Sequence, residues 1–201
     1  MYIKQSTLSS FQLYFAIGLE HILDIKGYDH ILFVLALCAV FTWKDWRKIL
    51  VLVTAFTIGH SITLTLVTFD WITINSDLIE FLIPVTIFVT AFQNVFPLPF
   101  VKGNPKIPVN YLFALFFGLI HGMGFSNYLK AVMGKSASVT IELLAFNLGL
   151  EAGQVIIVLF YLLLSFIFVQ LLHLNKLKWL TVTSSMIMGM SLLMIIESKF
   201  W

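Results

Sequence analysis

The chain has 201 residues, of which 60% are hydrophobic and 11% are charged, and its formal net charge is +2. A soluble domain is typically about 45–50% apolar and about 25% charged, so this composition excludes an ordinary soluble globular protein. The charges form no basic patch, so we expect no nucleic-acid partner. Several apolar runs reach the ~20 residues needed to cross a bilayer. We therefore expect an all-α, polytopic transmembrane helix bundle embedded in a lipid bilayer.

Apolar runs follow one another along the chain at about 8–23, 29–43, 49–69, 78–96, 109–129, 139–172 and 179–196. They predict six or seven membrane helices in a single transmembrane domain over residues 1–201. The number depends on the first run, which is short for a span. This run either crosses steeply, re-enters the membrane or lies in the interface. Four prolines in residues 97–108 predict a loop there.

The sixth run, at 139–172, is longer than a bilayer requires. At 1.5 Å per residue it would measure ~50 Å, against a hydrocarbon core of ~30 Å. We expect its start to be interfacial, or the helix to tilt and protrude, with Gly149 and Gly153 as bending points.

The distribution of Lys and Arg predicts the orientation. If every run crosses, eight of the 12 basic residues fall on the N-terminal side and four on the opposite side. Cytoplasmic loops carry the excess of Lys and Arg, so the N-terminus is expected in the cytoplasm. If the first run does not cross, Lys4 changes sides and the other helices keep their orientation.

A polar break separates the first two apolar runs. Its sequence, EHILDIKGYDH, carries two histidines, His21 and His30, together with Glu20, Asp24 and Asp29. Such a cluster costs several kcal/mol in a bilayer unless it is hydrated, paired or bound to a ligand. We therefore interpret this break as one part of a functional site.

Further ionisable residues fall at a similar predicted depth, in the outer half of the bundle. His60 lies in a polar stripe on the third run, His121 lies in the fifth run, and Glu151 shares a helix face with Asn147 and Gln154. The two amides are most simply helix-packing residues. His173 falls at the inner edge and is expected to be an ordinary interfacial residue.

Imidazole and carboxylate together suit nickel, cobalt, zinc or iron, whereas thiolate ligands are lacking because Cys38 is the single cysteine. The candidate ligands of a divalent transition metal are His21, Asp29, His30, His60, His121 and Glu151. Two alternatives remain open: a proton or polar network without metal, and polar residues that only pack helices.

Four segments, GLEHILDIKGYDHILF, TAFTIGHSITL, FGLIHGMGF and FNLGLEAGQ, resemble the HupE/UreJ family of membrane proteins. The resemblance implies a small helical protein of the bacterial inner (plasma) membrane, and its hydrogenase- and urease-associated members are regarded as nickel or cobalt permeases. By this resemblance His21, Asp29 and His30 match the N-terminal metal motif, and His121 matches the later HG motif. Seven residues separate His21 from Asp29, where the permease pattern has five, which indicates a divergent branch.

Three functions are compatible with these residues. The first is a permease in which an outer site captures a divalent ion and polar stripes pass it inward. The alternative is a zinc-dependent intramembrane hydrolase, with a zinc-bound water as nucleophile and Glu151 or Asp29 as base. The third is a structural membrane subunit whose polar residues pack helices.

Overall fold

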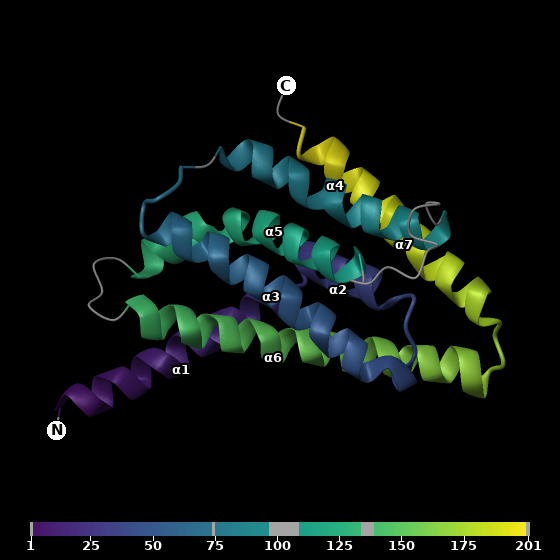
Figure 1. The fold of residues 1–201 in the computed structure, drawn as a ribbon, viewed down its shortest axis with the longest axis horizontal. Coiled ribbons are helices and arrows are strands. Elements are labelled where there is room, and N and C mark those ends of the chain that lie inside the picture. The colour runs from purple at the N-terminus through teal and green to yellow at the C-terminus, as the bar shows by residue number, and fades with distance from the viewer. Residues whose placement is uncertain (1, 74, 97–108, 134–138, 200–201) are drawn as a thin grey trace.

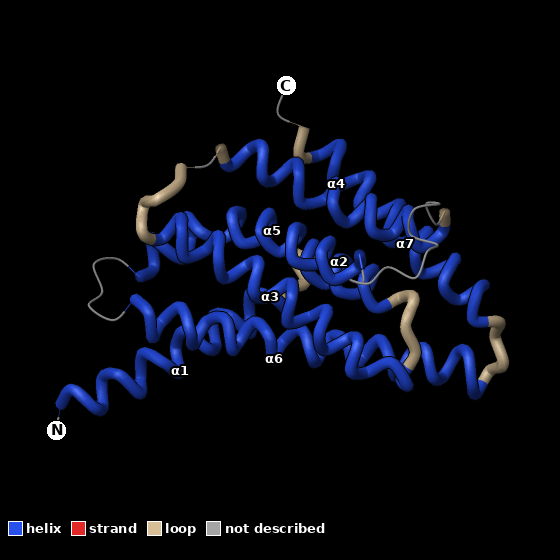
Figure 2. Tube along the Cα trace, viewed as in Figure 1, coloured by secondary structure: helices blue, strands red, loops and turns tan. Residues whose placement is uncertain are grey.

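The computed structural model describes residues 2–73, 75–96, 109–133 and 139–199. They form helices and no strand, which confirms the all-α class (Figures 1 and 2). The helices are α1 (Tyr2–Leu23), α2 (Asp29–Cys38), η1 (Trp43–Asp45), α3 (Trp46–Thr68), α4 (Ser76–Val95), α5 (Val109–Met133), α6 (Val139–Ser165), η3 (Phe166–Leu171) and α7 (Lys176–Glu197). The predicted loop at residues 97–108 lies outside the described residues.

Local side chains determine where several of these helices begin. Thr42 and Asp45 form a capping box before α3, with the Thr42 hydroxyl donating to Asp45 Oδ2 at 2.9 Å. Asn75 caps α4 and Asn175 caps α7, each by accepting from a backbone N–H of the first turn. Between α1 and α2, Asp24 Oδ1 accepts from the backbone N–H of Lys26 at 2.9 Å, a turn that holds the chain out of the helical conformation.

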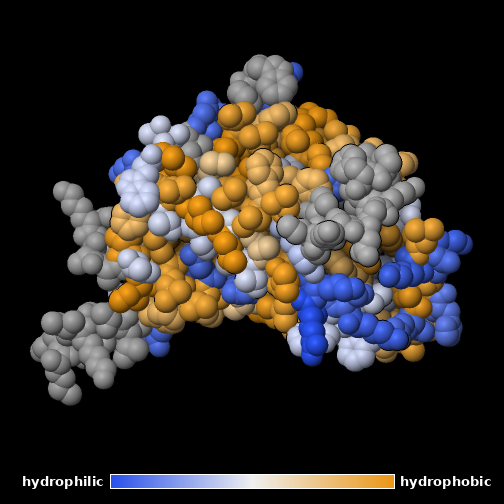
Figure 3. Space-filling view, in the orientation of Figure 1, coloured by the Kyte–Doolittle hydropathy of each residue, from blue (hydrophilic) through white to orange (hydrophobic). Residues whose placement is uncertain are grey.

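Length and apolar composition allow four segments to cross a membrane: Trp43–Thr68, Ser76–Val95, Val139–Leu171 and Lys176–Glu197. Two shorter apolar helical segments, Asp29–Cys38 and Tyr111–Ser126, accompany them. The visible face of the molecule is largely apolar (Figure 3), as expected of a surface in contact with lipid. The number of crossings, six or seven, and the side on which the N-terminus lies remain predictions.

The first two apolar runs form one broken path beside α6. Ile22, near the end of α1, contacts Gly153, and Tyr161, further along α6, lies 3.4 Å from the carbonyl oxygen of Ala39, just after α2. The contact that comes later in the α1–α2 segment also comes later in α6. The helices α1 and α2 therefore run in the same direction as α6 (Figure 1). The polar break therefore lies inside the bundle and not at the turn of a hairpin.

Glycines bring α1 against α6. A side chain at Gly149 would overlap the backbone of Phe15, and one at Gly18 would overlap the backbone of Phe146. The small residues let the two backbones approach closely, as in other membrane helix pairs. Gly149 and Gly153, the predicted bending points, both lie inside the continuous helix α6, and their absent side chains make room for α1.

Glycines also bring α3 against α5. A side chain at Gly59 would overlap the backbone of Leu115, and side chains at Gly118 and Gly122 would overlap the backbones of Phe56 and His60. The two close pairs, α1 with α6 and α3 with α5, carry most of the polar residues that the sequence singles out.

Candidate metal site

Four of the five histidines converge between the two helix pairs. His21 lies in the last turn of α1, His30 in the first turn of α2, His60 in the middle of α3, and His121 in α5. The close glycine contact between α3 and α5 places His60 beside Gly122, the residue that follows His121. The polar break inside the bundle brings His21 and His30 to the same depth.

Three of these imidazoles have the spacing of a metal site. One ring nitrogen from each of His21, His30 and His60 lies within 4.8 Å of the other two. The His30 ring occupies the centre, with its centroid 4.5 Å from that of His21 and 6.1 Å from that of His60. His121 lies on another side of His30, with ring centroids 5.1 Å apart.

Each histidine of this cluster has at least one buried ring nitrogen without a partner in the described structure. Within the described part of the chain, no hydrogen-bond partner reaches Nε2 of His21, His30 and His121 or either ring nitrogen of His60. A buried polar atom without a partner typically costs about 1–3 kcal/mol. Several such atoms at one point indicate a place where a ligand supplies the missing interaction.

Hydrogen bonds at the opposite edge of two rings leave these nitrogens available. Asp29 Oδ1 lies 3.0 Å from Nδ1 of His30, and the carbonyl oxygen of Phe117 lies 2.9 Å from Nδ1 of His121. When Nδ1 carries the proton, Nε2 of the neutral ring has a free lone pair. A carboxylate or a carbonyl behind the imidazole is the usual support of a histidine that binds metal.

Asp29 also interacts with the N-terminus of α2. Its Oδ1 also accepts from the backbone N–H of His30 at 2.9 Å, at the first turn of α2. The N-terminus of a helix carries a partial positive charge, which opposes a cation nearby. The Asp29 carboxylate offsets that charge beside the histidine cluster.

Phenylalanines enclose the cluster. Phe125 packs on His21 with ring centroids 3.7 Å apart, Phe146 stacks on His60 at 6.1 Å, and Phe33 lies 4.9 Å from His121. These rings exclude water and lower the local dielectric, which strengthens any interaction between an ion and its ligands.

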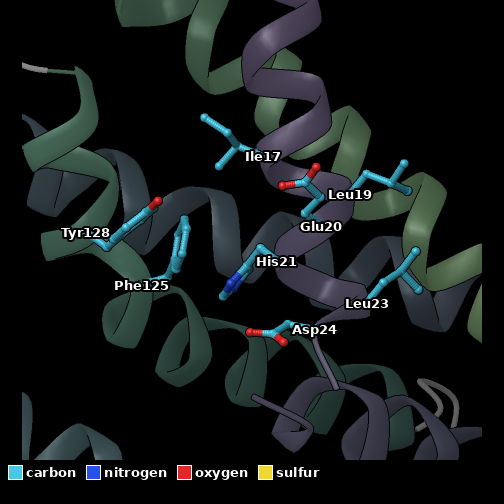
Figure 4. Close-up of a pocket in the computed structure, with 8 residues that line it drawn as sticks. All are labelled: Ile17, Leu19, Glu20, His21, Leu23, Asp24, Phe125 and Tyr128. Atoms are coloured by element: carbon cyan, nitrogen blue, oxygen red, sulfur yellow. The ribbon is translucent and has the colours of Figure 1, made fainter. Parts of the chain in front are cut away.

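One pocket reaches the cluster from outside. It lies between α1 and α5, has a volume of about 640 Å³, and ends at His21 (Figure 4). The carboxylates of Glu20 and Asp24 flank His21 in this pocket, and Phe125 and Tyr128 form the facing wall (Figure 4). His21 is therefore the cluster histidine that a solute would meet first.

The structure brings together five of the six predicted site residues. Asp29 joins through His30, whereas Glu151 does not belong to the histidine group and accepts instead from Thr54 Oγ1 at 2.8 Å. His173 is exposed in the segment between η3 and α7 and does not belong to the histidine group.

Gln154 has a larger part near the site than the sequence indicated. Its side chain is fully buried, its Oε1 accepts from Thr57 Oγ1 at 2.7 Å, and its Nε2 has no partner among the described residues. It shares a helix face with Glu151, so the pattern was visible, but an amide on a packed helix gives no signal that separates packing from function.

The apolar helices and the buried imidazole cluster define a helical integral membrane protein with a polar site inside its bundle. The chain belongs to the HupE / UreJ protein family, whose family model matches residues 1–200. No curated protein and no solved structure matched the chain.

Proposed function

We propose that this protein is a permease for a divalent transition-metal ion of the nickel or cobalt type in the bacterial inner membrane. The observation that supports the proposal best is the group formed by His21, His30 and His60, whose ligand atoms lie within 4.8 Å of one another. Each of the three has at least one buried ring nitrogen without a partner among the described residues. The metal ion is the substrate in this proposal.

The donor atoms favour this class of ion. Imidazole nitrogen suits nickel, cobalt, zinc, copper and iron, whereas magnesium and calcium prefer oxygen ligands. Three imidazoles are also fewer ligands than an octahedral ion accepts, so open coordination positions would keep the ion exchangeable. His121, on another side of His30, offers a further nitrogen toward which the ion can move.

The pocket at His21 supports an access route for a hydrated cation. Glu20 and Asp24 place two carboxylates at its wall, and negative charges in a cleft raise the local concentration of cations. From there the ion exchanges its water for the ring of His21 and then for those of His30 and His60.

The broken path of α1 and α2 fits the architecture of transporters. Secondary transporters often bind substrate where a membrane helix is interrupted, because the interruption frees polar groups inside the bundle. We propose that α1 and α2 together act as one discontinuous span, with Asp29 and His30 at its interruption.

Binding is the first test of the proposal. The detergent-purified protein is titrated with Ni²⁺ and Co²⁺ by isothermal calorimetry, beside His30→Ala, His60→Ala and the matched control His173→Ala. We expect exchangeable binding in the wild type and the control, and loss of at least tenfold in affinity in the two cluster variants. Equal affinity in all four proteins would refute the proposed metal site.

Transport is the second test. Proteoliposomes that contain the wild type should accumulate Ni²⁺ or Co²⁺ faster than empty vesicles, and His30→Ala should abolish the difference. Binding without uptake in either vesicle orientation would refute the permease and keep the metal site.

A zinc-dependent hydrolase is the second candidate function, and the same pocket supports it. Three histidines and an open position are a common catalytic zinc arrangement, and the pocket that ends at His21 carries carboxylates able to act as a base. One tightly held zinc per chain, with hydrolysis of lipid or peptide substrates that a chelator abolishes, would favour the enzyme.

A further inference from the structure

A second polar feature lies where α3 and α6 meet. Thr54 Oγ1 donates to Glu151 Oε1 at 2.8 Å, and one turn further along both helices Thr57 Oγ1 donates to Gln154 Oε1. Hydrophilic surface interrupts the apolar face between these helices (Figure 3). Glu151 is only partly buried there, and a carboxylate on a face toward lipid is costly unless something neutralises it.

Asn147 adds an oxygen without a partner to this place. Its Nδ2 donates to the carbonyl oxygen of Leu143 at 2.9 Å, and its Oδ1 is buried and has no partner in the described structure. Asn147 and Glu151 are four residues apart on α6, so their side chains are neighbours on one helix face. An amide oxygen without a donor beside a carboxylate indicates a missing positive group.

The nearby amide of Gln154 adds no free oxygen to this place, because its atom without a partner among the described residues is Nε2, a donor. It is fully buried, and the hydroxyl of Thr57 holds its Oε1. The residues Thr54 on α3 and Asn147 and Glu151 on α6, here called the seam, present hydroxyl, amide and carboxylate oxygens. A hydroxyl that donates its proton keeps lone pairs for an ion.

We propose that Asn147, Glu151 and Thr54 form an oxygen-lined site for a monovalent cation such as sodium. Oxygen ligands select hard cations, in contrast to the imidazoles of the histidine cluster. The charge argues for a monovalent ion, because one carboxylate and one positive charge make a neutral site inside the membrane. A divalent ion would leave a net charge in a region of low dielectric.

The ion links α3 to α6 in this arrangement. It binds beside the hydrogen bond that joins Thr54 to Glu151, and α3 carries His60 nearly two turns further on. A filled site therefore stabilises the packing that positions one of the cluster histidines. The binding itself needs no transition metal, so its test is independent of the permease proposal.

Thermal unfolding of the detergent-purified full chain, followed by circular dichroism, tests the site. Scans are run in sodium chloride and in choline chloride at equal ionic strength. At a sodium concentration ten times the dissociation constant, we expect the midpoint to rise by roughly 3–6 °C over choline. No sodium-dependent rise in the wild type would overturn the proposal, as would an equal or larger rise in magnesium chloride.

Variants locate the effect. Glu151→Gln and Asn147→Leu should lose the sodium-dependent rise, and Thr54→Val, which keeps the carboxylate, should reduce it. Glu80→Gln is the matched control, because Glu80 is an exposed carboxylate on α4 outside the seam, and it should keep the full rise. A rise that survives in Glu151→Gln would refute the site, and if that variant does not fold, an undiminished rise in Thr54→Val would do the same.

Discussion

Asp29 and His30, neighbours in the chain, are joined side chain to side chain, with Asp29 Oδ1 3.0 Å from Nδ1 of His30. This contact directs Nε2 of His30 into the cluster as the nitrogen that can bind an ion. The carboxylate thus acts through the histidine, both by fixing its tautomer and by raising its basicity.

Removal of this carboxylate should weaken metal binding without removing a ligand. We expect Asp29→Ala to lower the affinity for Ni²⁺ by about 10- to 100-fold, the usual cost of losing such a support. Calorimetric titration of the detergent-purified protein measures the change. Asp77→Asn, an exposed carboxylate in the first turn of α4, is the control. Unchanged affinity in Asp29→Ala would show that His30 needs no orienting group.

The close packing of α1 on α6 should depend on a glycine. Gly149→Ala adds a methyl group that overlaps the backbone of Phe15, so we expect a loss of about 1–3 kcal/mol in the free energy of unfolding. Gly189→Ala is the matched control, because nothing lies within 4 Å of the added methyl group and the helix propensity improves. Chemical denaturation in mild detergent compares them, and equal stabilities would contradict the close contact. Weaker metal binding should accompany the loss, since α1 carries His21.

The Thr57–Gln154 hydrogen bond should be worth more than an ordinary threonine contact. Thr57→Val leaves the buried amide of Gln154 without its donor, at a cost of about 1–3 kcal/mol in stability. Thr68→Val on the same helix removes only a bond from Oγ1 to the carbonyl oxygen of Leu64, and its effect should be within about 0.5 kcal/mol.

A double replacement checks the mechanism of that loss. Thr57→Val with Gln154→Leu replaces both partners by apolar side chains, so most of the stability should return. A double variant as unstable as the sum of the single ones would mean that the pair does not act as a unit.

The pocket carboxylates should affect the rate of uptake more than the affinity. In Glu20→Gln with Asp24→Asn, we expect the initial rate of Ni²⁺ uptake into proteoliposomes to fall several-fold at low ionic strength. The difference from the wild type should shrink at 0.15 M salt, where the Debye length is about 8 Å. A loss that does not depend on salt would instead make these residues direct ligands.

Much of the candidate site was predictable from the sequence because membrane burial makes polar residues conspicuous. His21, His30, His60 and His121 each interrupt an apolar run, and an ionisable residue at that depth needs a reason. Glu151 was as conspicuous and was grouped with them, but depth alone does not distinguish residues on different helix faces. Its contact with Thr54 depends on how α3 crosses α6, which no local pattern encodes.

What the sequence by itself determined is the class of protein, the approximate helix positions and the residues that a membrane would not tolerate without a function. These depend on composition and helical period, which are local properties. Only the tertiary structure decided that α1 and α2 follow α6 in one direction, so that the polar break lies inside the bundle. The physical reason is that glycine contacts between helices far apart in the sequence set the helix positions, and those positions gather the imidazoles and leave Glu151 apart.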